Sequence, residues 1–249
     1  IVYQSVNACI ALLGSLNACH VVTLDCLQAE PLHPVQQAMV DCHASQCGFC
    51  SPGFVMSLLA WWLNTPAKVL TSAADFTSHR HSVEFALSGN LCRCTGYQPI
   101  LLAADQLAPL DRSTDTLFSA LGGYSHCLGT LRAMSVEQHY DRVNTYQRPQ
   151  DLNQLAFIYD AMPEARLVAG ATDLALDITP GLKSFKNLID IKSVAQLQAI
   201  DEDSGTLAIG AAVSLSELET YCQAKLPCMT QLLGRFASRQ VRNRGTLVG

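Results

Sequence analysis

The sequence predicts an α+β protein with more than one domain, because its two halves differ in their pattern of apolar residues. The chain has 249 residues, of which 49% are hydrophobic, so it is long enough for two domains with real cores. Residues 33–107 show apolar positions at helical spacing in successive segments. From about residue 150, short apolar runs alternate with turns and helical segments, which indicates a mixed domain.

Composition and charge exclude several classes of partner. The formal net charge is −5 and no basic cluster is present, so neither nucleic acid nor an anionic membrane is expected as a partner. No apolar run reaches the roughly 18 residues that a membrane helix needs. The absence of a signal peptide predicts a cytoplasmic protein. Because the chain begins at Ile1 and ends in "RGTLVG", we expect both ends to be cut from a longer polypeptide.

The first half is expected to contain one strand followed by helices. The segment "HVVTLDCL" (20–27) is rich in β-branched residues and predicts a strand. Four helices are then predicted, because proline suits a first helical turn and Thr or Ser an N-cap. They open at Pro34, around Pro52 in "SPGFVMSLLAWWLN" (51–64), after Thr71 or Ser72 with a stop at Gly89, and near Pro99.

The second half begins after a connector of weak periodicity, residues 108–145. Helical spacing and turn residues place the elements that follow. Helices are predicted at 151–163, 214–224 and 226–241. Strands with turns are predicted at 165–176, 187–193, 197–203 and 206–214. The domain that these elements build is expected to span residues 146–249.

Two tight pairs of cysteines carry the chemistry of the first half. Cys47 and Cys50 lie in "HASQCGFCSPG", and Cys92 and Cys94 lie in "NLCRCTGYQP". Each pair is followed by a short turn with glycine and proline and then by a predicted helix. Two helix starts, with their unpaired N–H groups, can hold an anion between them. A [2Fe–2S] cluster bound by four thiolates is such an anion.

Structural zinc is the rival interpretation, because four cysteines also satisfy zinc. Zinc ribbons more often carry two C-x2-C or C-x4-C knuckles, whereas the second pair here is C-x-C and both pairs adjoin helices. The spacing favours the cluster but leaves zinc, or no metal, open. The other scattered cysteines are expected as small core residues, namely Cys19, Cys26, Cys42, Cys127, Cys222 and Cys228.

The cysteine segments resemble a known family. "VNACI", "HPVQQAMVDCHASQCGFCSPGFVMSL" and "LSGNLCRCTGYQPI" are similar to the two-cluster iron–sulfur domain of the molybdenum hydroxylases, the xanthine dehydrogenase and aldehyde oxidase family. The resemblance covers residues 1–105. It implies that residues 1–27 end a plant-type ferredoxin-like β-grasp domain, and that residues 28–107 form a four-helix [2Fe–2S] domain.

The same resemblance implies the roles of individual residues. Cys47, Cys50, Cys92 and Cys94 are expected to ligate the cluster of the helical domain, which lies nearer to molybdenum. Cys9 matches the last ligand of a second [2Fe–2S] cluster. Gln46 and Cys94 are expected to lie against the pterin of the molybdenum cofactor, which a partner domain or subunit holds.

The segment "ARLVAGATDLAL" suggests a phosphate-binding turn in the second half. Its small residues allow backbone N–H groups to approach a pyrophosphate, and Thr172 adds a hydroxyl donor. The segment is not the G-x-G-x-x-G fingerprint, and taken alone it is better explained by a plain strand with a tight turn. A run of arginines, Arg239, Arg242 and Arg244, is expected as a solvated or interface helix end.

Five further segments occur in the order seen in the PCMH-type FAD-binding domain of the same family: "YQRPQDLNQL", "LVAGATDLAL", "LIDI", "LAIGAAVSLSELE" and "FASRQVRNRGTLVG". The domain is expected to be incomplete, since the chain stops within a second glycine-rich FAD loop, in which Val248 stands where many relatives have a glycine. The resemblance implies FAD contacts from Leu167, Val168, Ala169, Gly170, Ala171, Thr172, Asp173, Leu174, Phe236, Thr246 and Gly249.

The resemblance also implies the function of an electron relay, closest to the small subunit of a bacterial xanthine dehydrogenase. Electrons from a molybdenum-binding large subunit or domain pass through the [2Fe–2S] clusters to FAD and on to NAD+, in a hetero-oligomer. No catalytic acid, base or nucleophile is expected in this chain, and the fragment alone is expected to be inactive. The alternatives are the same relay in an aldehyde or N-heterocycle hydroxylase, and a zinc-stabilised interaction module without enzymatic activity.

Overall fold

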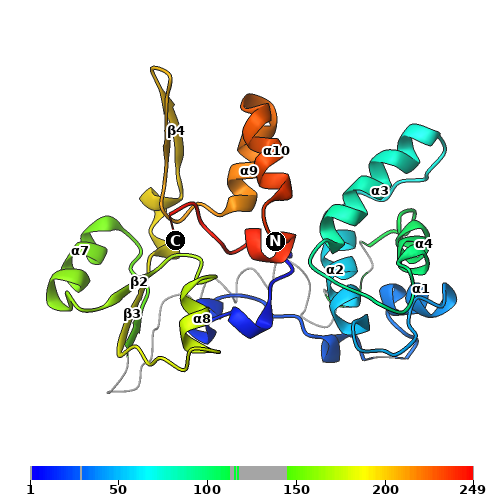
Figure 1. Cartoon of the computed structure of the whole chain (residues 1–249), viewed down its shortest axis with the longest axis horizontal. Coiled ribbons are helices and arrows are strands. Elements are labelled where there is room, and N and C mark those ends of the chain that lie inside the picture. Colours follow the sequence, from blue (N-terminus) through cyan, green and yellow to red (C-terminus); the bar gives the residue numbers. More distant parts are fainter. Residues whose placement is uncertain (1, 29, 113–114, 116, 118–144, 249) are drawn as a thin grey trace. The chain divides into compact units, whose positions relative to one another are not determined.

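The computed structural model describes residues 2–28, 30–112, 115, 117 and 145–248 (Figure 1). Its contacts divide the chain into two compact units, which we call the helical unit and the flavin unit. The helical unit comprises Ile1–Ser5 and His20–Arg132, and the flavin unit comprises Val6–Cys19 and Ala133–Gly249. Each unit has buried clusters of its own. Most of the predicted connector 108–145 lies outside the described residues.

The strand predicted at residues 20–27 is wrong. The start of the chain contains short 3₁₀ helices instead, η1 (Ala8–Ile10), η2 (Leu13–Leu16) and η3 (Leu24–Leu27). No strand of the described residues pairs with 20–27, and β-branched residues without a ladder do not form a sheet. Residues 1–27 are also divided between the two units. The described part of this region therefore shows no strand of the expected β-grasp.

The four helices predicted for the helical unit are confirmed. They are α1 (Pro34–Asp41), α2 (Ser51–Asn64), α3 (Ala73–Leu87) and α4 (Gln98–Leu107). Proline lies in the first turn of α1, α2 and α4. Ser72 caps α3 through a capping box, since its hydroxyl accepts the N–H of Asp75 at 3.1 Å.

One apolar core holds these helices together and so fixes the loops between them. Its fully buried members include Val35 on α1, Leu58 on α2, Val83 on α3 and Ile100 on α4. Truncation of such a residue to alanine costs about 2–5 kcal/mol. The cysteine loops that precede α2 and α4 are therefore anchored to a rigid base.

The flavin unit contains two small sheets. Strands β1 (Thr145–Gln147), β3 (Asn187–Asp190) and β2 (Arg166–Val168) form a parallel sheet in the order β1-β3-β2, with Val168 opposite Asp190. Strands β4 (Ile200–Asp203) and β5 (Thr206–Ile209) form an antiparallel hairpin. Ser204 and Gly205 have positive φ angles of 48° and 81°, as a two-residue hairpin turn requires.

The helices of this unit agree in part with those predicted from the sequence. They are α7 (Leu152–Ala161), α8 (Leu174–Ile178), α9 (Leu215–Lys225), α10 (Pro227–Arg235) and α11 (Arg239–Arg242), with 3₁₀ turns η4 (Ile191–Ser193) and η5 (Ala195–Gln198). The strand predicted at 165–176 is shorter, because the chain turns into α8. The helix predicted at 226–241 is broken: Ala237 has a φ of 50°, and Ser238 caps α11.

Among the described residues, no helix combines the length and apolar character that a membrane crossing requires.

Candidate functional site

The two predicted cysteine loops lead directly into α2 and α4. Cys50 is the N-cap residue of α2, and Tyr97 is the N-cap residue of α4. Gly48 and Gly96 turn the loops with φ angles of 81° and 68°, and a Cβ at either position would meet no atom within 4 Å. The glycines are therefore needed for the left-handed backbone rather than for lack of space.

The structure brings the four predicted ligands together in two pairs that bridge the loops. The thiol of Cys47 interacts with that of Cys94, and the thiol of Cys50 with that of Cys92. Cys92 is only 4% exposed, whereas Cys47 and Cys94 lie at the surface. Each pair contains one cysteine from each helix start, so both loops are needed to complete the site.

In each pair, one cysteine has a lowered pKa, which favours its thiolate form. The hydroxyl of Thr95, 3.2 Å from Sγ of Cys92, and the N–H of Thr95, 3.5 Å away, lower the pKa of Cys92 to about 7. The N–H of Phe49 lowers the pKa of Cys47. Burial raises the pKa of Cys50. Donors aimed at sulfur stabilise negative charge there, as a thiolate-ligated cluster needs.

The four cysteines are the ligand set of both metal centres that the sequence leaves open. Cys92 acts electrostatically on each of Cys47, Cys50 and Cys94, so the thiols of the two loops form one group. Four cysteine thiolates ligate a [2Fe–2S] cluster, two on each iron, and the same set satisfies zinc.

Three polar residues that no sequence motif marked support these loops. The N–H of Cys92 donates to the Tyr97 hydroxyl at 3.0 Å, and Thr95 contacts its sulfur. Nδ2 of Asn90 donates to Oγ of Ser57 on α2 at 2.8 Å. The only sequence signal was their position, since Asn, Thr and Tyr immediately flank the second cysteine pair.

Gln46, the predicted pterin neighbour, is exposed directly before Cys47. Cys9, the predicted ligand of a second cluster, lies exposed in η1 and belongs to the other unit. Three cysteines expected in the core are exposed instead, Cys19, Cys26 and Cys228. Cys222 is buried as expected, and Cys127 lies outside the described residues.

A tight loop between β2 and α8 contains the predicted pyrophosphate contacts. Val168, Ala169, Gly170 and Ala171 are buried, whereas Leu167 and Asp173 are exposed and Thr172 and Leu174 are half-buried. A Cβ on Gly170 would lie 2.0 Å from the carbonyl oxygen of Arg244. Ala171 has a φ of 61°. The loop therefore packs against residues 244–245, where only glycine fits.

This packing brings a second predicted contact, Thr246, beside the loop. Gly245 lies against the hydroxyl of Thr172, and Thr246 forms a β-bridge with Ser214. The hydroxyl oxygen of Thr246 is buried and has no hydrogen-bond partner among the described residues. A buried hydroxyl without a partner is costly, so this site fits a polar ligand such as a phosphate. Phe236 is 54% exposed, and Gly249 lies outside the described residues.

The arginine run was expected as a solvated or interface helix end, but one of its members, Arg242, is buried. Arg242 is 1% exposed and Glu219 is 3% exposed, and Nε of Arg242 lies 3.5 Å from Oε2 of Glu219. Nη1 of Arg242 donates to the carbonyl oxygens of Phe236 and Ala237 at 2.7 and 2.9 Å. Arg242 therefore fixes the bend between α10 and α11 from inside the unit.

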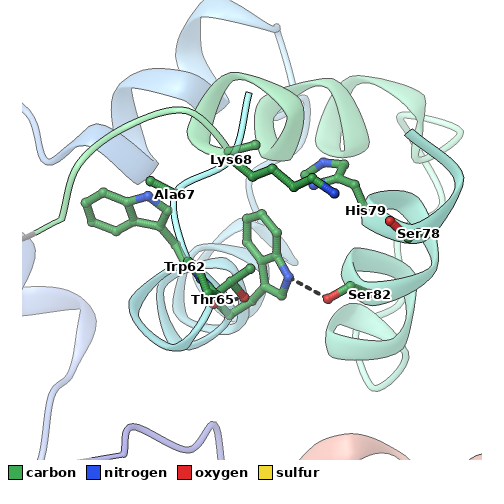
Figure 2. Close-up of a pocket in the computed structure, with 10 residues that line it drawn as sticks. Trp62, Thr65, Ala67, Lys68, Ser78, His79 and Ser82 are labelled. Carbon is green, nitrogen blue, oxygen red and sulfur yellow. Dashed lines mark hydrogen bonds between the residues drawn. The ribbon is translucent and has the colours of Figure 1, made fainter. Parts of the chain in front are cut away.

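The helical unit also has a pocket of about 270 Å³ at the C-terminal end of α2, the end opposite to Cys50 (Figure 2). Its polar groups are engaged within the unit: Trp61 donates to Ser82 at 3.0 Å, and His79 lies 2.9 Å from Asp105. Lys68 pairs with Asp75 at 2.5 Å. His79 is thus a buried, paired residue.

Replacing Thr246 by valine is expected to separate ligand binding from folding. The variant removes a buried hydroxyl that has no partner among the described residues, so the free energy of unfolding of the FAD-free protein should stay level or rise by up to about 1 kcal/mol. FAD affinity should fall roughly ten-fold, since the predicted hydrogen bond from Thr246 to FAD would be lost. Denaturant unfolding and a flavin fluorescence titration measure the two effects. Unchanged affinity would contradict the contact.

Two family models match the chain in the order of its units. The model described as "[2Fe-2S] binding domain" matches residues 23–105, and "FAD binding domain in molybdopterin dehydrogenase" matches residues 138–249. A xanthine dehydrogenase of Drosophila subobscura is 29% identical over 99% of this chain. Xanthine dehydrogenase 2 and abscisic-aldehyde oxidase of Arabidopsis thaliana are each 28% identical, over 100% and 98% of the chain.

The chain spans about a fifth of the length of these relatives, 21%, 22% and 20% respectively. The matches nevertheless cover both units. The chain combines a [2Fe–2S] binding domain with a FAD binding domain, and these matches, together with the xanthine dehydrogenase relatives, support the molybdenum hydroxylase family.

Proposed function

We propose that the chain is the electron-transfer part of a molybdenum-dependent xanthine dehydrogenase, between a molybdenum centre on a partner subunit or domain and NAD+. The observation that carries the proposal is the presence of an iron–sulfur domain and a FAD domain on one polypeptide. Iron–sulfur centres supply one-electron steps, and a flavin couples such steps to the hydride chemistry of NAD+.

In this proposal, the cysteine loops hold the first cluster. Cys47, Cys50, Cys92 and Cys94 are its ligands, and the N–H groups of Phe49 and Thr95 stabilise the charge on sulfur. The exposed side of the loops, with Gln46, is the side that faces the molybdenum-binding partner. Cys9 contributes one ligand to the second cluster.

The flavin unit, in turn, holds FAD through backbone and hydroxyl groups. The loop Leu167–Leu174 wraps the pyrophosphate, and the packing of Gly170 against residue 244 fixes its tight turn. Thr246 supplies its unpartnered hydroxyl. Phe236 supplies an exposed aromatic ring near the flavin. None of these residues acts as an acid or base on the substrate.

Anaerobic reduction of the holoenzyme tests the proposal. Xanthine should bleach both the iron–sulfur and the flavin absorbance, and NADH should reduce the same centres in reverse. Reduction of neither centre by either compound would contradict the relay.

The second candidate is the same relay in an aldehyde hydroxylase, and a specific similarity supports it. The abscisic-aldehyde oxidase is as similar to this chain as xanthine dehydrogenase 2 is, since both are 28% identical. The relay residues are the same in both candidates. Reduction of the centres by an aldehyde but not by xanthine would favour this candidate.

A further inference from the structure

The segment Val6–Cys19, which carries Cys9, packs within the flavin unit, against its residues 133–249. Nη2 of Arg244 donates to Oγ of Ser15 at 2.8 Å, and Nη1 of Arg148 donates to the carbonyl oxygen of Asn17 at 2.9 Å. Gly14 lies against the ring of Tyr146, where an added Cβ would come within 2.6 Å of a ring carbon. These contacts hold the segment in place at Gly14, Ser15 and Asn17.

The residues that hold this segment are themselves buried or half-buried and hydrogen-bonded. The hydroxyl of Tyr146 donates to Oδ2 of Asp190 at 2.8 Å, and Nε of Arg148 lies 3.6 Å from the same oxygen. Asp190 is 1% exposed. On the segment, the hydroxyl of Ser15 donates to the carbonyl oxygen of Leu12 at 2.6 Å while it accepts from Arg244. Buried hydrogen bonds of this kind favour a single arrangement.

The same residue that holds the segment also holds the flavin loop. The carbonyl oxygen of Arg244 packs on Gly170, while its guanidinium reaches Ser15. The sheet reinforces this proximity, because Arg148 follows β1, Asp190 ends β3 and the flavin loop follows β2. In a parallel sheet, these positions share the carboxyl edge, where ligands of open α/β sheets bind.

We propose that Arg244 couples the flavin loop, Ala169–Asp173, to the segment Val6–Cys19, so that FAD binding tightens the segment that carries Cys9. The proposal rests on the proposed function for the roles of the loop and of Cys9. Coupling of this kind is reciprocal, so the docked segment in turn strengthens FAD binding. Arg244 is a positioning residue, since it acts through the backbone of the loop and the hydroxyl of Ser15.

Hydrogen exchange of the holoenzyme, before and after removal of FAD, tests the coupling. In the unmodified protein, FAD should slow the exchange of amides in Val6–Cys19. Arg244→Met keeps the length of the side chain but removes its donors, and it should abolish this FAD-dependent slowing. In the FAD-free protein it should also speed exchange of the segment roughly ten-fold, as expected for loss of one charged hydrogen bond. Arg235→Met, at an exposed arginine of α10, is the matched control. It should change neither the FAD-dependent slowing nor the exchange rate of the segment in the FAD-free protein.

Ser15→Ala removes the other partner of the same bond and leaves residue 244 and the flavin loop untouched. It should reproduce the effect of Arg244→Met, and the double variant should add little, since both remove one interaction. An equal slowing by FAD in the unmodified protein and in both variants would overturn the coupling. If the purified holoenzyme contains no FAD, the proposed flavin site fails. The exchange comparison of the FAD-free proteins then still decides whether Arg244 holds the segment.

Discussion

Cys92→Ala is expected to remove the cluster of the helical unit. Cys92 is the most buried of the four cysteines, it pairs with Cys50 across the loops, and it receives the donors of Thr95. Loss of this thiolate leaves three ligands for a cluster that needs four. Iron and sulfide should fall by about two each per chain, and the corresponding S = 1/2 EPR signal of the dithionite-reduced protein should disappear.

Cys26→Ala is the matched control in the same unit. Cys26 is exposed in η3 and lies outside the two loops, so this variant should keep the full iron content and the EPR signal. Circular dichroism of both variants checks that α1 to α4 remain folded. A Cys92→Ala protein that retains its iron, its sulfide and its signal would contradict the assignment of this residue as a ligand.

Gly170→Ala is expected to damage both stability and FAD binding. The new Cβ would lie 2.0 Å from the carbonyl oxygen of Arg244 and 2.9 Å from Cα of Gly245. Both atoms belong to the backbone, so the loop and residues 244–245 must move apart. Overpacking of this kind costs about 1–3 kcal/mol of unfolding free energy. FAD affinity should fall by roughly ten-fold or more, because a displacement of the loop misplaces its N–H groups.

Gly234→Ala, in the same unit, is expected to have the opposite effect on stability. Its Cβ would meet only Oε1 of Glu219 at 3.7 Å, an ordinary contact, and it lies inside α10. Alanine is a better helix former than glycine, so stability should rise by up to about 1 kcal/mol with unchanged FAD affinity. Denaturant unfolding and flavin titration compare the two variants. Equal stability of both variants would contradict the tight packing at Gly170.

The sequence predicted the helical unit well, because local signals and tertiary packing agree there. Helix α2 covers the predicted residues 51–64, with Pro52 in its first turn and an apolar run that the core buries. Ser72, one of the two proposed caps, forms the capping box with Asp75. The meeting of the two cysteine pairs was also foreseen, since both pairs precede helices that share one core.

The features that the sequence did not predict depend on contacts between distant segments. A local sequence pattern carries no information about such contacts. The strand predicted at 20–27 fails because no described strand lies beside it. The bend at Ala237 carries neither glycine nor proline, and buried Arg242 holds it through the carbonyl oxygens of residues 236 and 237. The burial of Arg242 itself follows from its partner Glu219 on α9. The ligand and FAD-contact roles remain predictions that the variants above test.

Metal and sulfide analysis of the purified protein, combined with EPR after dithionite reduction, decides whether the two cysteine loops hold an iron–sulfur cluster. We expect at least about two irons and two acid-labile sulfides per chain and an S = 1/2 signal from the loops of Cys47, Cys50, Cys92 and Cys94. Zinc in place of iron, with no sulfide and no EPR signal even after anaerobic reconstitution with iron and sulfide, would contradict this expectation.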